Sequence, residues 1–470
     1  MKNKNNSHSS GSTTYLWFIC LIAAFGGLVF GYDIIVVSGV IPQVVKQFEL
    51  TAFQLGFLVS CALWGCAIGS GLGGIIIDAF GRKKVLIIAS IILSISAVWC
   101  SIANSTTLLI SVRLLGGIGC GLVAISCPLY ISEVSPEKYR GRMVTLYHFS
   151  VCFGIVICVF VNWAIFLFAD EHLDSKTLSP FWRWFVIDQS WRSMLASEAF
   201  PGVLFLIGTF LLPESPRWLI ENDRTQEAES ILAKINGKNR AHQIYIEIRD
   251  TVRFESRISF FDLFTAKLFR PLLLSILICV FSEACGISVV LYYGPQLFEQ
   301  AGLSLGRALG GFSILAIVLL VFNLVAMHFI DTVGRRKLLA IGATGAMICL
   351  IAIGSLYLVE QTGFIIVFAT TAFVAFFASS IGPMKFVILS EIFPNRIRGK
   401  AISVGTVFIW LTSAAVAQLF PMMRETMHTG YIFLFFALDL AALLMVIKFL
   451  MPETKGRTIE EIERSWLLDK

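Results

Sequence analysis

The chain has 470 residues, of which 57% are hydrophobic and only 14% are charged. A soluble domain has fewer apolar and more charged residues, so this composition excludes an ordinary water-soluble protein. The net charge of +6 could suggest a nucleic-acid partner, but the basic residues lie in short segments between apolar runs and form no single face. We therefore expect a membrane protein with no nucleic-acid partner.

The apolar residues are concentrated in twelve runs, each near or above the roughly 20 residues that cross about 30 Å of hydrocarbon. The first run follows Lys2 and Lys4, as in a signal peptide, but it is too long for one and reads as an uncleaved first span. The runs predict an all-α fold with twelve transmembrane helices, near 15–38, 53–77, 84–103, 107–131, 143–168, 193–213, 270–298, 308–330, 338–359, 363–389, 401–422 and 430–451.

Five parts follow from this reading of the chain. We expect a cytoplasmic N-terminal tail (1–14), a first six-helix bundle (15–213), a cytoplasmic helical linker (214–269), a second six-helix bundle (270–452) and a cytoplasmic C-terminal tail (453–470). In the linker, apolar residues recur with helical spacing among many charges, which is typical of short amphipathic helices.

The two bundles are predicted to be copies of one unit. Residues 132–142 are repeated at 390–400, and residues 78–83 are repeated at 331–336, at a similar offset. Both copies run in the same direction, which is the pattern of a parallel repeat in secondary transporters.

Basic residues predict the topology. The charged turns at 82–84, 140–142, 335–337 and 396–400 all fall on one side of the predicted membrane. By the positive-inside rule this side is cytoplasmic, so an even number of spans places both termini in the cytoplasm.

Together with a specific Pro-Glu-Ser-Pro-Arg-Trp-Leu motif at 213–219, these repeats resemble the sugar porter family of the major facilitator superfamily. Further matches are Gly31-Tyr32-Asp33 and the Pro-Glu-Thr-Lys-Gly segment at 452–456. The resemblance implies two six-helix bundles around a central cavity, in a monomer of the plasma or inner membrane. It implies alternating-access symport of a sugar or polyol with a proton, with the lipid bilayer as surroundings and without cofactor or metal.

The resemblance also implies a charge network at the cytoplasmic helix ends, in which ion pairs between the half-bundles form in one state and break in the other. The alternative is that these loop charges only set topology. The expected network is Asp78, Arg82, Glu133, Arg142, Arg192, Glu198, Glu214, Asp331, Arg335, Glu391 and Arg398.

Ionisable residues inside spans are costly and are therefore functional candidates. Asp33 stands where symporters of the family carry Asp and facilitators usually carry Asn, and it could pair with Arg113 of the fourth span. Protonation of Asp33 would break the pair and couple a proton to the conformational change. The alternative is a static structural salt bridge.

The expected sugar site departs from the family, because most of its amides are replaced. Span seven reads Ser-Glu-Ala-Cys-Gly-Ile-Ser at 282–288, and Leu319 and Ser413 stand where the family has Asn. The candidate substrate-binding residues are His148, Ser282, Glu283, Ser288, Tyr292, Tyr293, Lys385, Phe386 and Trp410.

Two interpretations of Glu283 and Lys385 stay open: a buried structural pair, or groups that bind a charged substrate. For His148, a hydrogen-bonded core imidazole and a ligand contact are both possible.

The alternative functions are transport of a non-sugar, charged organic solute and a nutrient receptor that does not transport. No nucleophile and base pair, metal cluster or phosphate loop indicates an enzyme.

Overall fold

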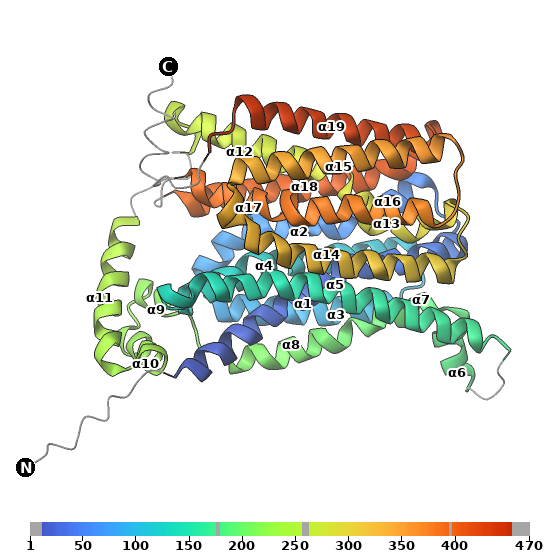
Figure 1. Cartoon of the computed structure of the whole chain (residues 1–470). Coiled ribbons are helices and arrows are strands. Elements are labelled where there is room, and N and C mark those ends of the chain that lie inside the picture. The colour runs from blue at the N-terminus through green and yellow to red at the C-terminus, as the bar shows by residue number, and fades with distance from the viewer. Residues whose placement is uncertain (1–11, 175–178, 256–262, 394–396, 454–470) are drawn as a thin grey trace, which may run out of the picture.

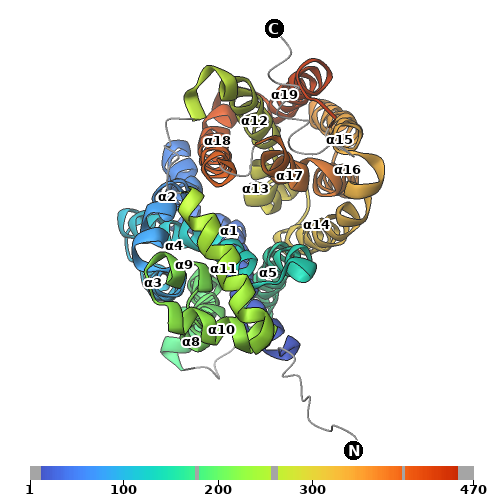
Figure 2. The same ribbon diagram turned by 90° about the vertical axis from the view of Figure 1, so that its left-hand side faces the viewer.

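The computed structural model describes residues 12–174, 179–255, 263–393 and 397–453. These ranges contain helices and connecting turns and no β-strand. Twelve helices or helix pairs are long and apolar enough to cross a membrane, which confirms the predicted number. They lie side by side in two bundles, one from each half of the chain (Figures 1 and 2).

The N-terminal half contains the first six spans, the last of which is a pair of helices. Between the fifth and sixth spans lie a short helix and a π-helical turn. The elements are α1 (Thr13–Phe48), α2 (Ala52–Phe80), α3 (Arg82–Ser101), α4 (Thr106–Val134), α5 (Glu137–Glu171), α6 (Pro180–Trp182), η1 (Arg183–Asp188), α7 (Ser190–Ser197) and α8 (Ala199–Leu211).

We call the end of the molecule at which α3 begins, at Arg82, the motif end, and the end at which α3 finishes, at Ser101, the opposite end. The predicted linker helices are present and lie at the motif end, where α11 crosses the N-terminal half (Figure 2). They are α9 (Pro216–Glu221), α10 (Thr225–Asn236) and α11 (Lys238–Glu255).

The C-terminal half contains the remaining six spans, two of which are interrupted. The seventh span is α12 followed by α13, and the tenth is α16 and α17 joined by π-helical η3. The elements are α12 (Ala266–Ala284), α13 (Ile287–Gln300), α14 (Leu305–Val333), α15 (Arg335–Leu358), α16 (Phe364–Phe376), η3 (Phe377–Ile381), α17 (Gly382–Ile392), α18 (Arg398–Thr426) and α19 (Thr429–Phe449).

Glycine sets both the close packing of spans and the break in the seventh span. A Cβ on Gly65 of α2 would come within 2.8 Å of the Gly117 Cα of α4, so these two helices touch backbone to backbone. Gly286 has a φ of 85°, a conformation that ordinary residues rarely adopt, and it separates α12 from α13. The apolar pattern alone predicted one continuous helix there.

The halves meet along two equivalent seams. Helix α2 packs against α18, and α5 packs against α14. Since α2 and α14 occupy equivalent places in the two repeats, as do α5 and α18, the two seams are related by the duplication. Near the opposite end, Trp64 Nε1 donates to Gln418 Oε1 at 2.9 Å and Ser60 Oγ donates to the same atom at 3.4 Å.

Candidate functional site

The predicted pair of Asp33 and Arg113 is present in the interior of the N-terminal half. Their exposed fractions are 3% and 2%. Arg113 Nη1 lies 4.0 Å from Asp33 Oδ1, and Arg113 Nη2 donates to the Asp33 backbone oxygen at 3.2 Å. The ionic contact is therefore long, and the arginine is also held by the backbone of α1.

Two further groups that sequence reasoning did not assign to this pair lie beside it. Cys120 of α4 donates its S–H to Asp33 Oδ2 at 3.0 Å. Glu198, at the junction of α7 and α8, is 2% exposed and interacts electrostatically with Asp33 and Arg113. Two carboxyl groups therefore interact electrostatically with one arginine. Glu198 is an ionisable residue inside the sixth apolar run, and this is the sequence signal that could have pointed to a role beside Asp33.

The structure brings Glu283 and Lys385 into direct contact within the C-terminal half. Lys385 Nζ of α17 donates to Glu283 Oε1 of α12. The other carboxylate oxygen, Oε2, accepts from Ser413 Oγ of α18 at 2.6 Å, and Ser413 Oγ accepts from Ser288 Oγ at 3.1 Å. The network joins four helices and places Ser413, which stands for a family amide, on the glutamate.

Aromatic side chains connect this network to the N-terminal half. The rings of His148 of α5 and Phe386 of α17 lie 5.8 Å apart between centroids. The rings of Phe30 of α1 and Trp410 of α18 meet edge to face at 5.6 Å. Four predicted site residues, His148, Phe386, Trp410 and Lys385, therefore gather where the halves face each other.

The remaining predicted contact residues are Ser282 and the two tyrosines. Ser282 Oγ is buried and hydrogen-bonds to none of the described residues. Tyr292 is buried and interacts electrostatically with Glu283. Tyr293 donates its hydroxyl to the Ala417 backbone oxygen at 2.8 Å and packs on Phe420, so it ties α13 to α18.

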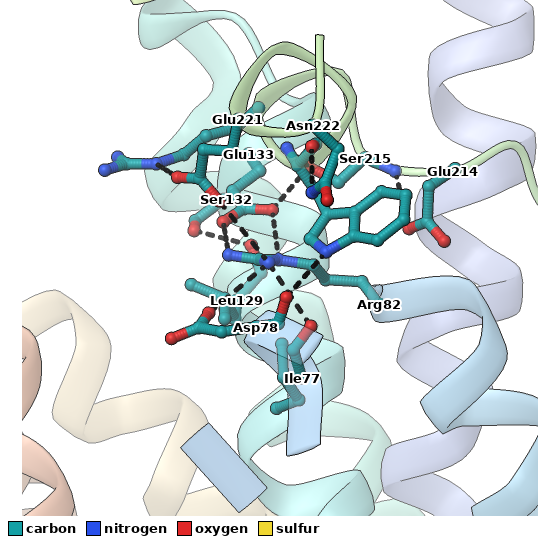
Figure 3. A network of polar contacts seen from close by, with 12 residues as sticks. Ile77, Asp78, Arg82, Leu129, Ser132, Glu133, Glu214, Ser215, Glu221 and Asn222 are labelled. Atoms are coloured by element: carbon teal, nitrogen blue, oxygen red, sulfur yellow. Dashed lines mark hydrogen bonds and ion pairs between the residues drawn. The ribbon is translucent and has the colours of Figure 1, made fainter. Parts of the chain in front are cut away.

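A charge network at the motif end holds Arg82, as Figure 3 shows. Arg82 Nη2 and Nε donate to the two carboxylate oxygens of Glu133 at 2.9 and 3.0 Å, which is the strong bidentate arrangement. Asp78, which is largely exposed, lies 3.5 Å from Arg82 Nη1. Glu214 accepts from the Lys83 backbone N–H at 3.0 Å at the start of α3.

The linker contributes to the same network. Ser215 donates its hydroxyl to Glu133 at 2.5 Å, and Trp218 Nε1 donates to the Asp78 backbone oxygen at 2.9 Å. Glu221 of α9 lies 3.9 Å from Arg82. Burial raises the pKa of the Glu221 carboxyl, an effect that Arg82 opposes.

The C-terminal half repeats this arrangement. Arg335 Nη2 donates to Glu391 Oε1 at 2.8 Å, and the Arg335 backbone N–H donates to Glu453 at 3.1 Å. Arg142 is exposed on α5, Arg398 lies on the first turn of α18, and the side chain of Asp331 lies outside the described part. The Arg82–Glu133 and Arg335–Glu391 pairs each lie within one half in this conformation, whereas the prediction concerned pairs between halves.

Arg192 and Glu198 lie away from the motif end, contrary to the prediction: Glu198 is in the interior beside Asp33, and Arg192 is at the opposite end. Its guanidinium donates to the backbone oxygens of Ser101 and Ala103 at 3.0 and 2.8 Å, and it lies over the ring of Trp191. The predicted spans already placed residue 192 on the non-cytoplasmic side, just before the sixth span, so its assignment to a cytoplasmic network was wrong. Arg192 is in the first turn of α7, which starts at the opposite end. Arg192 connects α7 to the turn between α3 and α4.

The profile of the family described as "Sugar (and other) transporter" matches residues 19–466 of the chain. The chain is 33% identical to the arabinose-proton symporter of Bacillus subtilis (strain 168) over 462 residues, which are 98% of this chain and 96% of that protein. It is 34% identical to the D-xylose-proton symporter of Escherichia coli (strain K12) over an alignment of 493 positions. The alignment covers 97% of this chain and 96% of that protein.

Solved structures of the xylose transporter XylE from E. coli are similar over the whole fold. An inward open conformation matches with a TM-score of 0.81 at 32% identity, over 96% of this chain and 100% of that chain. XylE bound to 6-bromo-6-deoxy-D-glucose matches with a TM-score of 0.79 at 33% identity, over 97% of this chain and 99% of that chain.

Proposed function

This chain belongs to the sugar (and other) transporter family and has the major facilitator fold, and we propose that it imports a sugar or polyol together with a proton. It is a multi-pass membrane protein with twelve apolar spans. The similar proteins named arabinose-proton and D-xylose-proton symporters support this proposal over nearly the full chain.

The observation that carries the proton-coupling part is the buried carboxylate of Asp33. Asp33 and Arg113 lie on different helices, at the loose distance of 4.0 Å, so loss of the charge on Asp33 would remove the ionic contact between α1 and α4 and leave only the hydrogen bond from Arg113 to the Asp33 backbone oxygen. A buried ion pair adds little net stability compared with apolar packing. A purely structural role therefore does not explain well why Asp33 and Arg113 are present. Glu198 is the nearby carboxyl to which a proton could pass.

Alternating access then consists of movement of one half against the other. The contacts of Gln418 with Trp64 and Ser60 hold the halves together near the opposite end. Gly310 of α14 packs on Trp163 of α5 along the second seam. With the basic motifs on the cytoplasmic side, the opposite end faces outward, and both termini lie in the cytoplasm.

Asp33→Asn tests this function. The variant keeps the size of the side chain but removes the proton site, so accumulation against a gradient should disappear while exchange of labelled for unlabelled solute persists. The measurement is uptake into proteoliposomes of L-arabinose, D-xylose, D-glucose and myo-inositol, with and without an imposed proton gradient.

Asp170→Asn is the matched control, since it makes the same chemical change at an exposed position of α5 in the same half. It should leave accumulation intact. Accumulation by Asp33→Asn that still depends on the proton gradient would remove Asp33 from proton coupling.

A further inference from the structure

The ion pair between Glu283 and Lys385 occupies the middle of the predicted solute site. Their exposed fractions are 5% and 7%, and the two side chains come from different helices, α12 and α17. Burying two charges costs several kcal/mol for each ion, and apolar residues of similar volume usually stabilise a protein as well or better. Stability is therefore a poor reason for a charged pair at this position.

The pair leaves Lys385 with unused hydrogen-bonding capacity. A lysine ammonium has three N–H donors, and Glu283 accepts one of them. The nitrogen lies 5.4 Å from the ring centroid of Phe386, the ring that faces His148 of the other half. Lys385 thus reaches the surface between the halves, where a transported solute must pass.

Two other residues of the predicted site also have unpaired donors. Trp410 Nε1 and Ser282 Oγ are buried and hydrogen-bond to none of the described residues. An indole N–H can only donate, and the Glu283 carboxylate already accepts from Lys385 and Ser413. The remaining N–H groups of Lys385 and the N–H of Trp410 are therefore donors that a ligand could satisfy.

We propose that the solute carries a carboxylate beside its hydroxyl groups, as aldonic and uronic acids do, and that its carboxylate pairs with Lys385. This inference rests on the proposed transport function and specifies the class of solute. The carboxylate supplies acceptors for these donors, and charge-assisted hydrogen bonds to an ammonium are the stronger kind.

Charge balance assigns a role to Glu283. The empty site is neutral, with one carboxylate and one ammonium, so a bound acid anion would leave a net negative charge in a buried place. A proton on Glu283 restores neutrality and frees Lys385 for the solute. The other titratable groups near this pair are His148 on α5, Tyr292 on α13, Cys279 and Cys285 on α12, and Asp439 on α19 beside Cys285.

The experiment compares binding of D-gluconate and D-glucuronate with binding of D-glucose and D-xylose to purified protein, by calorimetry on the monodisperse fraction. The native protein should bind one of the acids about tenfold or more tightly than the neutral sugars. Lys385→Met should lose that preference and leave the neutral sugars within about threefold.

Lys448→Met is the matched control. The Lys448 nitrogen also lies 5.4 Å from a phenyl centroid, that of Phe449, but at the exposed end of α19. This change should alter neither acid nor neutral binding.

Glu283→Gln separates the proposal from a structural pair, because it should act in the opposite direction to Lys385→Met. It imitates protonated Glu283 and frees Lys385, so acid binding should strengthen. If a single variant does not fold, the double variant Glu283→Gln with Lys385→Met, which contains no unpaired charge, should show the loss of acid preference.

Three results would overturn the proposal. The first is that the native protein binds neutral sugars more tightly than the acids. The others are that each single variant changes the affinity for acids and for neutral sugars by the same factor, or that the double variant ranks the ligands as the native protein does. Proton-driven accumulation of D-xylose or D-glucose without acid transport would overturn this inference alone. Folded protein that transports no member of the panel would instead contradict the proposed function.

Discussion

At the scale of single residues, the site is defined by polar groups without protein partners. Trp410 illustrates this, because its ring is fixed against Phe30 while its Nε1 has no hydrogen-bond acceptor among the described residues. A buried donor without an acceptor costs free energy, so it fits a position where a ligand supplies the acceptor. Trp410 was among the residues predicted to bind solute.

Trp410→Phe should weaken binding of the best ligand in a panel of sugars, polyols and sugar acids by about 3- to 10-fold, the value of one hydrogen bond. Phenylalanine retains the contact with Phe30, so thermal stability should stay the same or rise slightly. The measurement is calorimetric affinity together with the thermal unfolding midpoint.

Trp163→Phe is the control for Trp410, because Trp163 Nε1 is also buried without a partner among the described residues but packs on Gly310 in the α5–α14 seam. It should not change affinity. Equal loss in both variants would mean that Trp410 acts through packing of the halves.

At the scale of elements, interruptions in spans are local and each has a cause in the chain. The break between α12 and α13 follows from Gly286, where a Cβ would collide with the ring of Phe436 and where φ is positive. The break places Glu283 near the end of α12 and Ser288 and Tyr292 on α13, so it shapes the predicted solute site.

Gly286→Ala should lower both thermal stability and transport rate, since it adds about 1–2 kcal/mol of backbone strain and displaces Phe436. Gly363→Ala provides the comparison. Gly363 also has a positive φ, of 92°, but a Cβ there meets nothing within 4 Å. Stability should fall in both variants and transport only in Gly286→Ala; unaffected transport in Gly286→Ala would show that the break is not needed for function.

The contacts of the motif-end network predict which of its acidic residues contribute most to stability. Glu133→Gln removes a bidentate partner from Arg82, whose exposed fraction is 4%, and should lower stability by about 1.5–3 kcal/mol. Glu221 lies farther from Arg82 and is 28% exposed on its side chain, so Glu221→Gln should cost less than about 1 kcal/mol.

Glu221 should also make the stability of the folded protein depend on pH. Because its pKa is raised in the folded state, the folded protein binds this proton more readily than the unfolded chain does. The contribution of Glu221 to stability is therefore present at low pH and is lost as pH rises through the raised pKa. Thermal midpoints measured from pH 4 to 8 should show this loss in the native protein and not in Glu221→Gln; a larger effect from Glu221→Gln than from Glu133→Gln would contradict the ranking.

At the scale of the whole molecule, the two halves are held together by contacts along their seams, and those near the opposite end include polar ones. Gln418 accepts from two side chains of α2, and a Cβ on Gly56 of α2 would meet the backbone oxygen of Gln418. If each hydrogen bond contributes about 1 kcal/mol, the two together bias the balance between conformations by about 30-fold.

Gln418→Ala should therefore increase the population that is open at the opposite end. Spin labels attached at the exposed positions Phe53 and Met427, near the ends of α2 and α18, would show this as a longer distance between the two labels, measured by pulsed electron paramagnetic resonance. Gln300→Ala is the control, since Gln300 bonds to Thr429 within the C-terminal half. Unchanged distances in Gln418→Ala would show that side-chain packing alone closes this end.

The sequence by itself determined the membrane class, the twelve spans and the duplication, and it offered Arg113 as a partner for Asp33. These depend on local composition and on repetition, because a span must be apolar along its whole length and an isolated charge inside it needs a partner. The same reasoning placed Glu283 and Lys385 in the C-terminal half and left their relation open.

Only the tertiary structure decided which charges meet. It put Glu198 beside Asp33 and Arg113, the Arg192 guanidinium on the backbone oxygens of Ser101 and Ala103, and Ser413 on the carboxylate of Glu283. The extent of each apolar run fixes how far each residue lies along a span, but a run that is apolar on all sides does not fix how the helix is rotated about its axis or which helices are its neighbours. Those are decided by glycine contacts, helix breaks and the seams between halves, which join residues more than a hundred positions apart.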